Sequence, residues 1–202
     1  MYIPKHFKVE DKQVIYDFIE KNSFGILVSS HNGVPYATNL PLVLDRDQGY
    51  LYGHFARPNT QWLDIEEQEI LVIFQGPHHY ISSSWYETNE SVPTWNYVAV
   101  HVYGRVERID DRTELLHGLK ELVSKYEEMS SSYTIDEQNQ SYVDKLIQGI
   151  VGFRLKINRL EGKWKLSQNH SAERKEMVIE QLNLIGTDHA KEIANLMKER
   201  MK

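Results

Sequence analysis

The chain has 202 residues, of which 41% are hydrophobic and 26% charged, as expected for one folded domain or a domain with an appendage. It contains no cysteine, which excludes disulfides, thiolate metal sites and a cysteine nucleophile. The formal net charge of −6 argues against broad binding to nucleic acid, which depends on surplus lysine and arginine. The sequence starts without the apolar run of a signal peptide and has no stretch long enough for a membrane span. We therefore expect a soluble, cytoplasmic protein.

The first third of the sequence predicts one helix followed by short strands. Apolar residues recur at helical spacing after Asp11, which predicts a helix ending near Asn22. The strand patterns that follow cover residues 24–30, 34–44 and 50–55. Asn32-Gly33 predicts a tight turn, because both residues tolerate positive φ, and Pro41 predicts a bend in the second strand. Three strands joined by short turns predict an antiparallel meander.

The rest of the sequence alternates between longer strands and helices. Strand patterns cover residues 70–76, 96–109 and 150–164; the first is the most apolar and is expected to be central, and the last is interpreted as a strand pair. Helical patterns cover about 111–126, 142–148 and two segments after Ser171, separated at Gly186. Residues 83–92 and 129–140 are polar and predict loops, the second of them mobile. The expected fold is mainly β with peripheral helices, a barrel decorated by helices.

Residues 75–103 carry an unusual density of rings that can form hydrogen bonds. They include His78, His79, His101, Trp85 and Trp95. Such rings suit a pocket for a flat ligand with polar edges, but they also suit the rims of a structural hairpin, and the residues alone leave both readings open. A metal site built from His54, His101 and one of the adjacent histidines is a weaker alternative, since neighbours on a strand point to opposite faces.

Three further segments have both a binding and a structural interpretation. Thr38 and Asn39 precede the expected bend at Pro41, where they could meet the edge of a ring or simply flank a bulge. Arg57 precedes a short helix capped by Asn59 or Thr60, which suits either an anion or a solvent-exposed arginine. Lys163 and Lys165 share one strand face opposite Trp164, an arrangement that suits either a phosphate or an edge strand with a core tryptophan.

The tail after Ser171 could suggest a helix-turn-helix. Its basic residues are balanced by acidic ones, whereas a recognition helix usually carries surplus positive charge. An αα-hairpin that packs on the body or on a partner is the favoured interpretation.

Several sequence blocks together resemble the PaiB family of FMN-binding negative transcriptional regulators. The blocks are MYIPKHF, TNLPL, GHFARPN-QW, FQGPHHYIS-SWY, VPTWNYVAVHVYG, IVGF and RLEGKWKLSQN, and they extend from Met1 to about Asn169. The resemblance implies a split β-barrel like that of pyridoxamine-phosphate oxidases, formed by residues 1–169, with residues 170–202 as a C-terminal helical extension. It also implies a homodimer with FMN at the interface and a repressor of sporulation and degradative-enzyme genes.

The resemblance also implies which residues bind FMN. They are Thr38, Asn39, Leu40, His54, Arg57, Asn59, Trp95, Asn96, His101, Lys163 and Trp164, some contributed by the second subunit. Arg57 with Lys163 or Lys165 would neutralise the phosphate, and Trp95 or Trp164 would cover the isoalloxazine ring. His170 stands where the family commonly has arginine, so FMN could be held less tightly.

Other functions stay open at this point. One alternative is a flavin-dependent oxidoreductase of the split-barrel class that does not bind DNA, because a fold does not fix a function. Direct binding to promoter DNA is weakly supported by the charge. Haem is a further alternative ligand, with His101 or His54 as the axial group.

Overall fold

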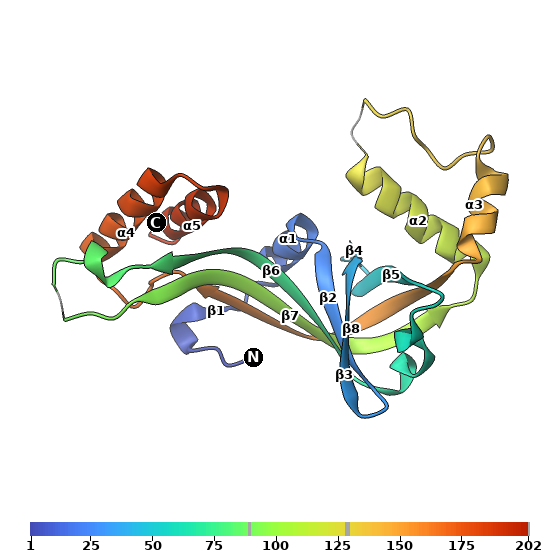
Figure 1. Ribbon diagram of the computed structural model, residues 1–202, viewed down its shortest axis with the longest axis horizontal. Coiled ribbons are helices and arrows are strands. Elements are labelled where there is room, and N and C mark those ends of the chain that lie inside the picture. The colour runs from blue at the N-terminus through green and yellow to red at the C-terminus, as the bar shows by residue number, and fades with distance from the viewer. Residues whose placement is uncertain (89, 128–129, 202) are drawn as a thin grey trace. The chain divides into compact units, whose positions relative to one another are not determined.

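The structure is a computed structural model and describes residues 1–88, 90–127 and 130–201. The helices are α1 (Lys12–Lys21), α2 (Arg112–Tyr126), α3 (Gln140–Ile147), α4 (Ala172–Ile185) and α5 (Asp188–Glu199). The strands are β1 (Lys8–Val9), β2 (Phe24–His31), β3 (Val34–Pro41), β4 (Val43–Asp45), β5 (Tyr50–Ala56), β6 (Ile70–Ile81), β7 (Thr94–Ile109) and β8 (Ile150–Lys165). Short 3-10 helices are η1 (Lys5–Phe7), η2 (Thr60–Leu63), η3 (Ile65–Glu67) and η4 (Ser83–Trp85). This confirms a mainly β fold with peripheral helices (Figure 1).

The strands are hydrogen-bonded in the order β3-β2-β6-β7-β8-β5-β4, and β1 also pairs with β8. The chain divides into two compact units. Unit 1 contains residues 1–18, 75–100 and 161–202, and unit 2 contains residues 19–74 and 101–160. The long strands β6, β7 and β8 contribute residues to both units. None of the helices within the described residues is long and apolar enough to cross a membrane.

Unit 2 begins with the β2–β3 hairpin, which has the predicted turn. The register runs from Phe24 opposite Pro41 to His31 opposite Val34, and Asn32 and Gly33 have φ values of 52° and 78°. The predicted bend at Pro41 is confirmed.

The predicted antiparallel meander is confirmed, with its middle strand divided in two at that bend. The segment 34–44 is split into β3 and β4, and β5 pairs with β4 and β8 but not with β3. Pro41 has no N–H with which to continue the ladder, and the next residue, Leu42, is fully buried and donates its N–H to the carbonyl of Ser23 at 2.9 Å.

The strand pair predicted at 150–164 is wrong, because β8 is one continuous strand of 16 residues. Its Gly162 does not have positive φ and makes no turn; it pairs with Val9 of β1. A Cβ at this position would lie 3.1 Å from Ile15, so the glycine allows α1 to approach the strand closely.

The core of unit 2 contains alternate strand residues, and α2, which has no buried residue of its own, packs against the sheet. Phe55 of β5 and Phe153 of β8 are buried, with ring centroids 4.9 Å apart. Asp111 caps α2 as predicted, by accepting the N–H of Glu114 at 2.8 Å. A Cβ on Gly152 would lie 2.5 Å from Leu115, so this glycine lets α2 pack directly on β8.

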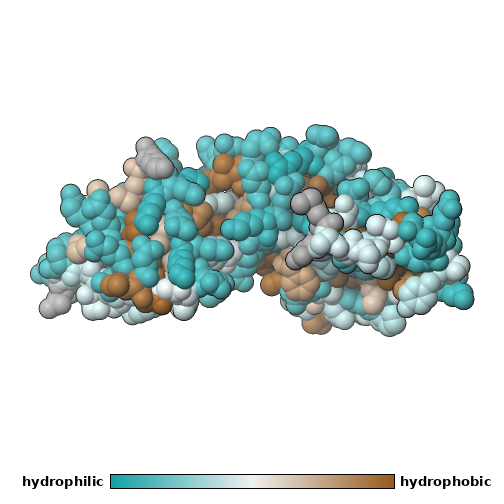
Figure 2. All heavy atoms as spheres, turned by 90° about the horizontal axis from the view of Figure 1, so that it is seen from above, coloured by the Kyte–Doolittle hydropathy of each residue, from teal (hydrophilic) through white to brown (hydrophobic). Residues whose placement is uncertain are grey.

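Unit 1 contains the predicted αα-hairpin. Ser171 and Thr187 cap α4 and α5, and Gly186, with φ of 72°, ends α4 in the left-handed conformation that favours glycine. The buried residues of the two helices are Val178, Ile179, Leu182, Ala190, Ile193, Ala194 and Met197. The face of the molecule shown in Figure 2 is mainly hydrophilic, with separate hydrophobic patches.

Candidate functional site

The predicted site residues fall into two groups. Unit 2 holds Thr38, Asn39, Leu40, His54, Arg57, Asn59 and His101, and unit 1 holds Trp95, Asn96, Lys163 and Trp164. The contacts of each group are described separately, and contact with FMN stays a prediction for all eleven.

Thr38 and Asn59 lie in direct contact, although 21 residues separate them. Asn59 caps η2 by accepting the N–H of Gln61 at 3.0 Å, and its side-chain amide donates to the Thr38 hydroxyl at 2.9 Å. The Thr38 hydroxyl donates in turn to the Gln61 side chain at 2.5 Å. The cap predicted at Asn59 therefore also positions a hydroxyl on β3.

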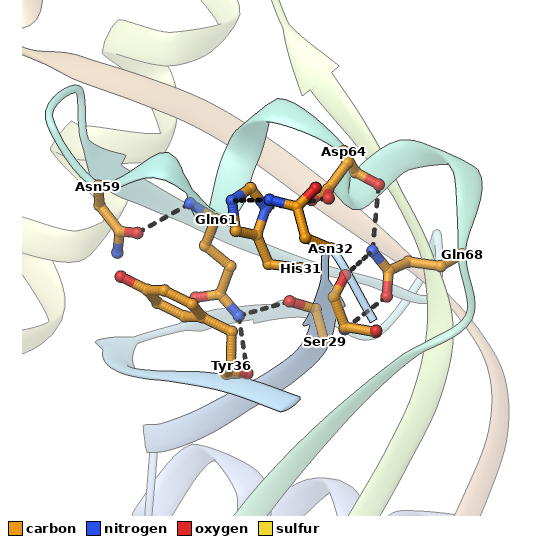
Figure 3. A network of polar contacts seen from close by, with 9 residues as sticks. Ser29, His31, Asn32, Tyr36, Asn59, Gln61, Asp64 and Gln68 are labelled. Carbon is orange, nitrogen blue, oxygen red and sulfur yellow. Dashed lines mark hydrogen bonds and ion pairs between the residues drawn. The ribbon is translucent and has the colours of Figure 1, made fainter. Parts of the chain in front are cut away.

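Gln61 is the centre of this network, and the sequence prediction did not include it. The side chain is fully buried, and its amide donates to the Ser29 hydroxyl at 2.8 Å and the Tyr36 carbonyl at 3.2 Å (Figure 3). One side chain thus ties η2 to both β2 and β3. Its only signal in the sequence was its position two residues after Asn59, within a matching block.

A second part of the network lies nearer the β2–β3 turn. The Asp64 carboxylate is hydrogen-bonded to the imidazole of His31 at 3.0 Å (Figure 3). The amide of Gln68 donates to the carbonyls of Ser30 and Asp64 at 2.8 and 3.1 Å. Together the two parts fix the loop after β5 against the hairpin.

β3 is the terminal strand of the sheet order, so one edge of its backbone has no neighbouring strand in this chain as described. Asn39 is exposed and Leu40 is 7% exposed, so the predicted segment alternates between solvent and core. An uncovered strand edge carries backbone donors and acceptors that can bind a ring edge or another chain.

Arg57 is exposed, and part of its guanidinium stabilises the turn before β8. Nε donates to the Gln148 carbonyl at 2.6 Å and Nη2 donates to the Ile150 carbonyl at 2.7 Å. A guanidinium has five N–H donors, so these bonds leave capacity for an anion. The arginine is thus both a structural brace and a candidate ligand.

His54 and His101 occupy different surroundings in unit 2. His54 borders a cavity of about 20 Å³ under α2, and burial lowers the pKa of its imidazole. The His101 ring lies 6.3 Å from that of Tyr103. Within the described residues no three His, Asp or Glu side chains gather in a way that could hold a metal ion, so the three-histidine alternative finds no support.

Three of the four predicted site residues in unit 1 are buried, and one is exposed. Trp164 is 4% exposed, and its ring packs against Phe18 with centroids 5.1 Å apart. Asn96 is fully buried and donates to the Ser167 hydroxyl at 3.0 Å. Lys163 is 8% exposed and donates to the Tyr2 carbonyl at 3.0 Å. Trp95, at 50% exposed, presents the most accessible ring of the four.

The histidine-rich stretch forms ring contacts among the unit 1 parts of β6 and β7 and the 3-10 helix η4. The His78 ring lies 5.4 Å from Trp95, and the His79 ring lies 6.4 Å from Trp85. The adjacent histidines therefore contact different rings, as expected for neighbours on a strand.

Comparison with known proteins identifies both the family and the fold. Residues 1–159 match the family described as "Putative FMN-binding domain". The chain is 42% identical over 206 residues to "Protease synthase and sporulation protein PAI 2" of Bacillus subtilis, covering all of this chain and 99% of that protein.

Two solved structures share the fold at low sequence identity. The flavocytochrome Anf3 from Azotobacter vinelandii has a TM-score of 0.65 at 16% identity, covering 87% of this chain and 78% of that one. The FAD and heme binding protein from Mycobacterium smegmatis has a TM-score of 0.62 at 12% identity, covering 84% and 78%. The predicted split β-barrel is confirmed, and the chain belongs to the PaiB family of proteins with an FMN-binding domain.

Proposed function

We propose that this protein is a cytoplasmic, homodimeric, FMN-binding transcriptional regulator that represses sporulation and degradative-enzyme genes. The observation that carries FMN binding is the uncovered edge of β3 beside the network of Thr38, Asn59 and Gln61. The regulatory role is supported by the Bacillus subtilis relative, whose name refers to protease synthesis and sporulation.

The donor groups of unit 2 fit the chemistry of FMN. The backbone edge and exposed amide at Asn39 suit the polar rim of the isoalloxazine ring, and the partly free guanidinium of Arg57 suits the phosphate. The hydrogen bond from Asn59 to Thr38 holds the loop after β5 against β3, between Asn39 and Arg57. When bound, FMN supplies reversible one- and two-electron redox chemistry.

The homodimer is supported by apolar side chains exposed on the β2–β3 hairpin. Phe24 and Val34 are 65% and 64% exposed, and Tyr36 is 36% exposed. An exposed strand edge with apolar side chains invites association unless another surface covers it, and a second copy would cover it symmetrically. Sedimentation equilibrium of the full chain should give the mass of a dimer, and a monomer at all concentrations would contradict this part of the proposal.

Titration of the purified protein with FMN tests the cofactor. We expect quenching of tryptophan fluorescence with a dissociation constant of about 1 μM or below. Arg57→Gln should weaken binding roughly tenfold, since it removes a charge-assisted contact to the phosphate. Arg112→Gln, which removes an exposed arginine paired with Asp144, is the matched control and should leave the affinity unchanged. Absence of quenching in the unmodified protein would refute the cofactor assignment.

The acidic net charge of −6 favours a second candidate, a flavin-dependent oxidoreductase that does not bind DNA. A mobility shift with promoter DNA at physiological salt, together with NAD(P)H oxidation in the presence of FMN, separates the two. A shift without oxidation supports the repressor, and oxidation without a shift supports the enzyme.

A further inference from the structure

Unit 1 contains a cleft of about 370 Å³ near the N-terminus of α4, within the size range of small-molecule sites. Its lining combines rings with basic and hydroxyl groups. The residues that matter here are Phe7, Tyr86, Thr94, Lys165, His170 and Arg174. All of them belong to unit 1.

Lys165 is the central charge of this cleft, and its partners are neutral. Its ammonium donates to the Thr94 hydroxyl and, at 2.6 Å, to the Trp95 carbonyl, and it lies 5.9 Å from the centroid of the Phe7 ring. The neighbouring ammonium of Lys163 likewise donates to a carbonyl, that of Tyr2. Within the described residues, no carboxylate lies at ion-pair distance from either lysine. Burial and the charge of Lys163 lower the pKa of Lys165, as expected for an ammonium that lacks an anion.

A second wall adds positive charge next to a stacked ring pair. The His170 ring stacks on Tyr86 with centroids 5.4 Å apart, and the Arg174 guanidinium lies 5.5 Å from the centre of the same tyrosine ring. Burial, Arg174 and Lys165 lower the pKa of His170. Glu87 pairs with Arg174 at 2.6 Å, and the exposed Glu90 also lines the cleft, so carboxylates offset part of this charge but none is paired with Lys165.

We infer that this cleft binds a small organic anion, whose carboxylate or phosphate group contacts Lys165 and His170 while its apolar part lies against Phe7. Such a ligand would give Lys165 the negative partner that the protein does not supply, and the tyrosine–histidine stack offers a flat surface beside it. For a regulator this would be an effector site. The resemblance also offers Lys165 to the FMN phosphate, so the test below includes competition with FMN.

Calorimetric titration of the full chain without FMN tests the site. The probes are inorganic phosphate and succinate, which separate the two anion classes, each taken up to about 10 mM. We expect one of them to bind saturably at one site per chain. Lys165→Gln and, independently, His170→Gln should each weaken binding about tenfold or more. Lys191→Gln removes an exposed lysine of unit 1 outside the cleft and should change the affinity less than twofold.

Two variants on different elements keep the test valid if one of them fails to fold. Binding of neither probe would overturn the inference, as would an equal loss in Lys191→Gln. A repeat at saturating FMN separates the cleft from the flavin site. Undiminished anion binding supports a separate site, and competition would show that the cleft is part of the flavin site and overturn the inference.

Discussion

Gln61→Leu tests whether the buried network of unit 2 is a stabilising element. The glutamine is fully buried and bonds to the Ser29 and Thr38 hydroxyls and to the Tyr36 carbonyl. Leucine has a similar volume but can neither donate nor accept, so all three groups lose a partner, the Ser29 hydroxyl in a buried place and the other two in partly buried ones.

The expected cost follows from these contacts. A hydrogen bond contributes about 1 kcal/mol net, so the three bonds together predict a loss of about 3 kcal/mol in the free energy of unfolding. For a chain of this length, that lowers the melting temperature by roughly 6–12 °C. Urea denaturation followed by circular dichroism measures the loss directly. The dependence of the unfolding free energy on urea concentration should have the same slope in the variant and the unmodified protein.

Gln68→Leu is the matched control, because Gln68 also makes three hydrogen bonds, to the Ser30 N–H and carbonyl and to the Asp64 carbonyl. Two of these bonds are exposed, so water can replace the lost partners and the cost should stay below about 1 kcal/mol. Equal losses in the two variants would refute the argument that burial makes the Gln61 contacts matter.

Three further predictions concern glycine packing and a half-buried histidine. Gly104→Ala should destabilise the protein by several kcal/mol in urea denaturation, since its Cβ would lie 2.1 Å from the Lys156 carbonyl oxygen. Gly118→Ala, in the middle of α2 with open space around it, should instead stabilise by about 1 kcal/mol in the same assay. Burial lowers the pKa of His54 below 6.5, so the unfolded chain takes up the proton first and stability falls as pH drops through that value. His54→Gln should reduce the loss of unfolding free energy between pH 7.5 and 5.5, measured by urea denaturation at each pH. An unchanged dependence of that free energy on pH would contradict the prediction.

Local signals in the sequence predicted the helices and turns well. Asp111, Asn59 and Gly186 are caps whose chemistry acts within a few residues, and Asn32-Gly33 defines a turn by its own backbone preference. Such features depend on neighbours along the chain, so they can be read without knowing the fold.

The failures involve partners that lie far apart in sequence. Nothing local shows that β8 continues through Gly162 as one strand, or that this glycine accommodates Ile15 of α1. The same limit applies to the site. Asn59 was expected as a cap, but its bond to Thr38 and the dependence of both on Gln61 appear only when β3 and η2 are placed together.

The C-terminal helices are joined to the rest of unit 1 by a contact that crosses the predicted boundary at residue 169. The buried amide of Asn96 donates to the hydroxyl of Ser167, before the boundary, and to the sulfur of Met197, beyond it, at 3.0 and 3.5 Å. Ser167 has a φ of 62°, a conformation that is costly for serine and persists when the surroundings hold it in place. Because a buried amide needs its partners, the helices after residue 169 and the end of β8 support each other. The boundary predicted from the sequence marks where the family blocks end, and we expect the residues on its two sides to fold as one cooperative element.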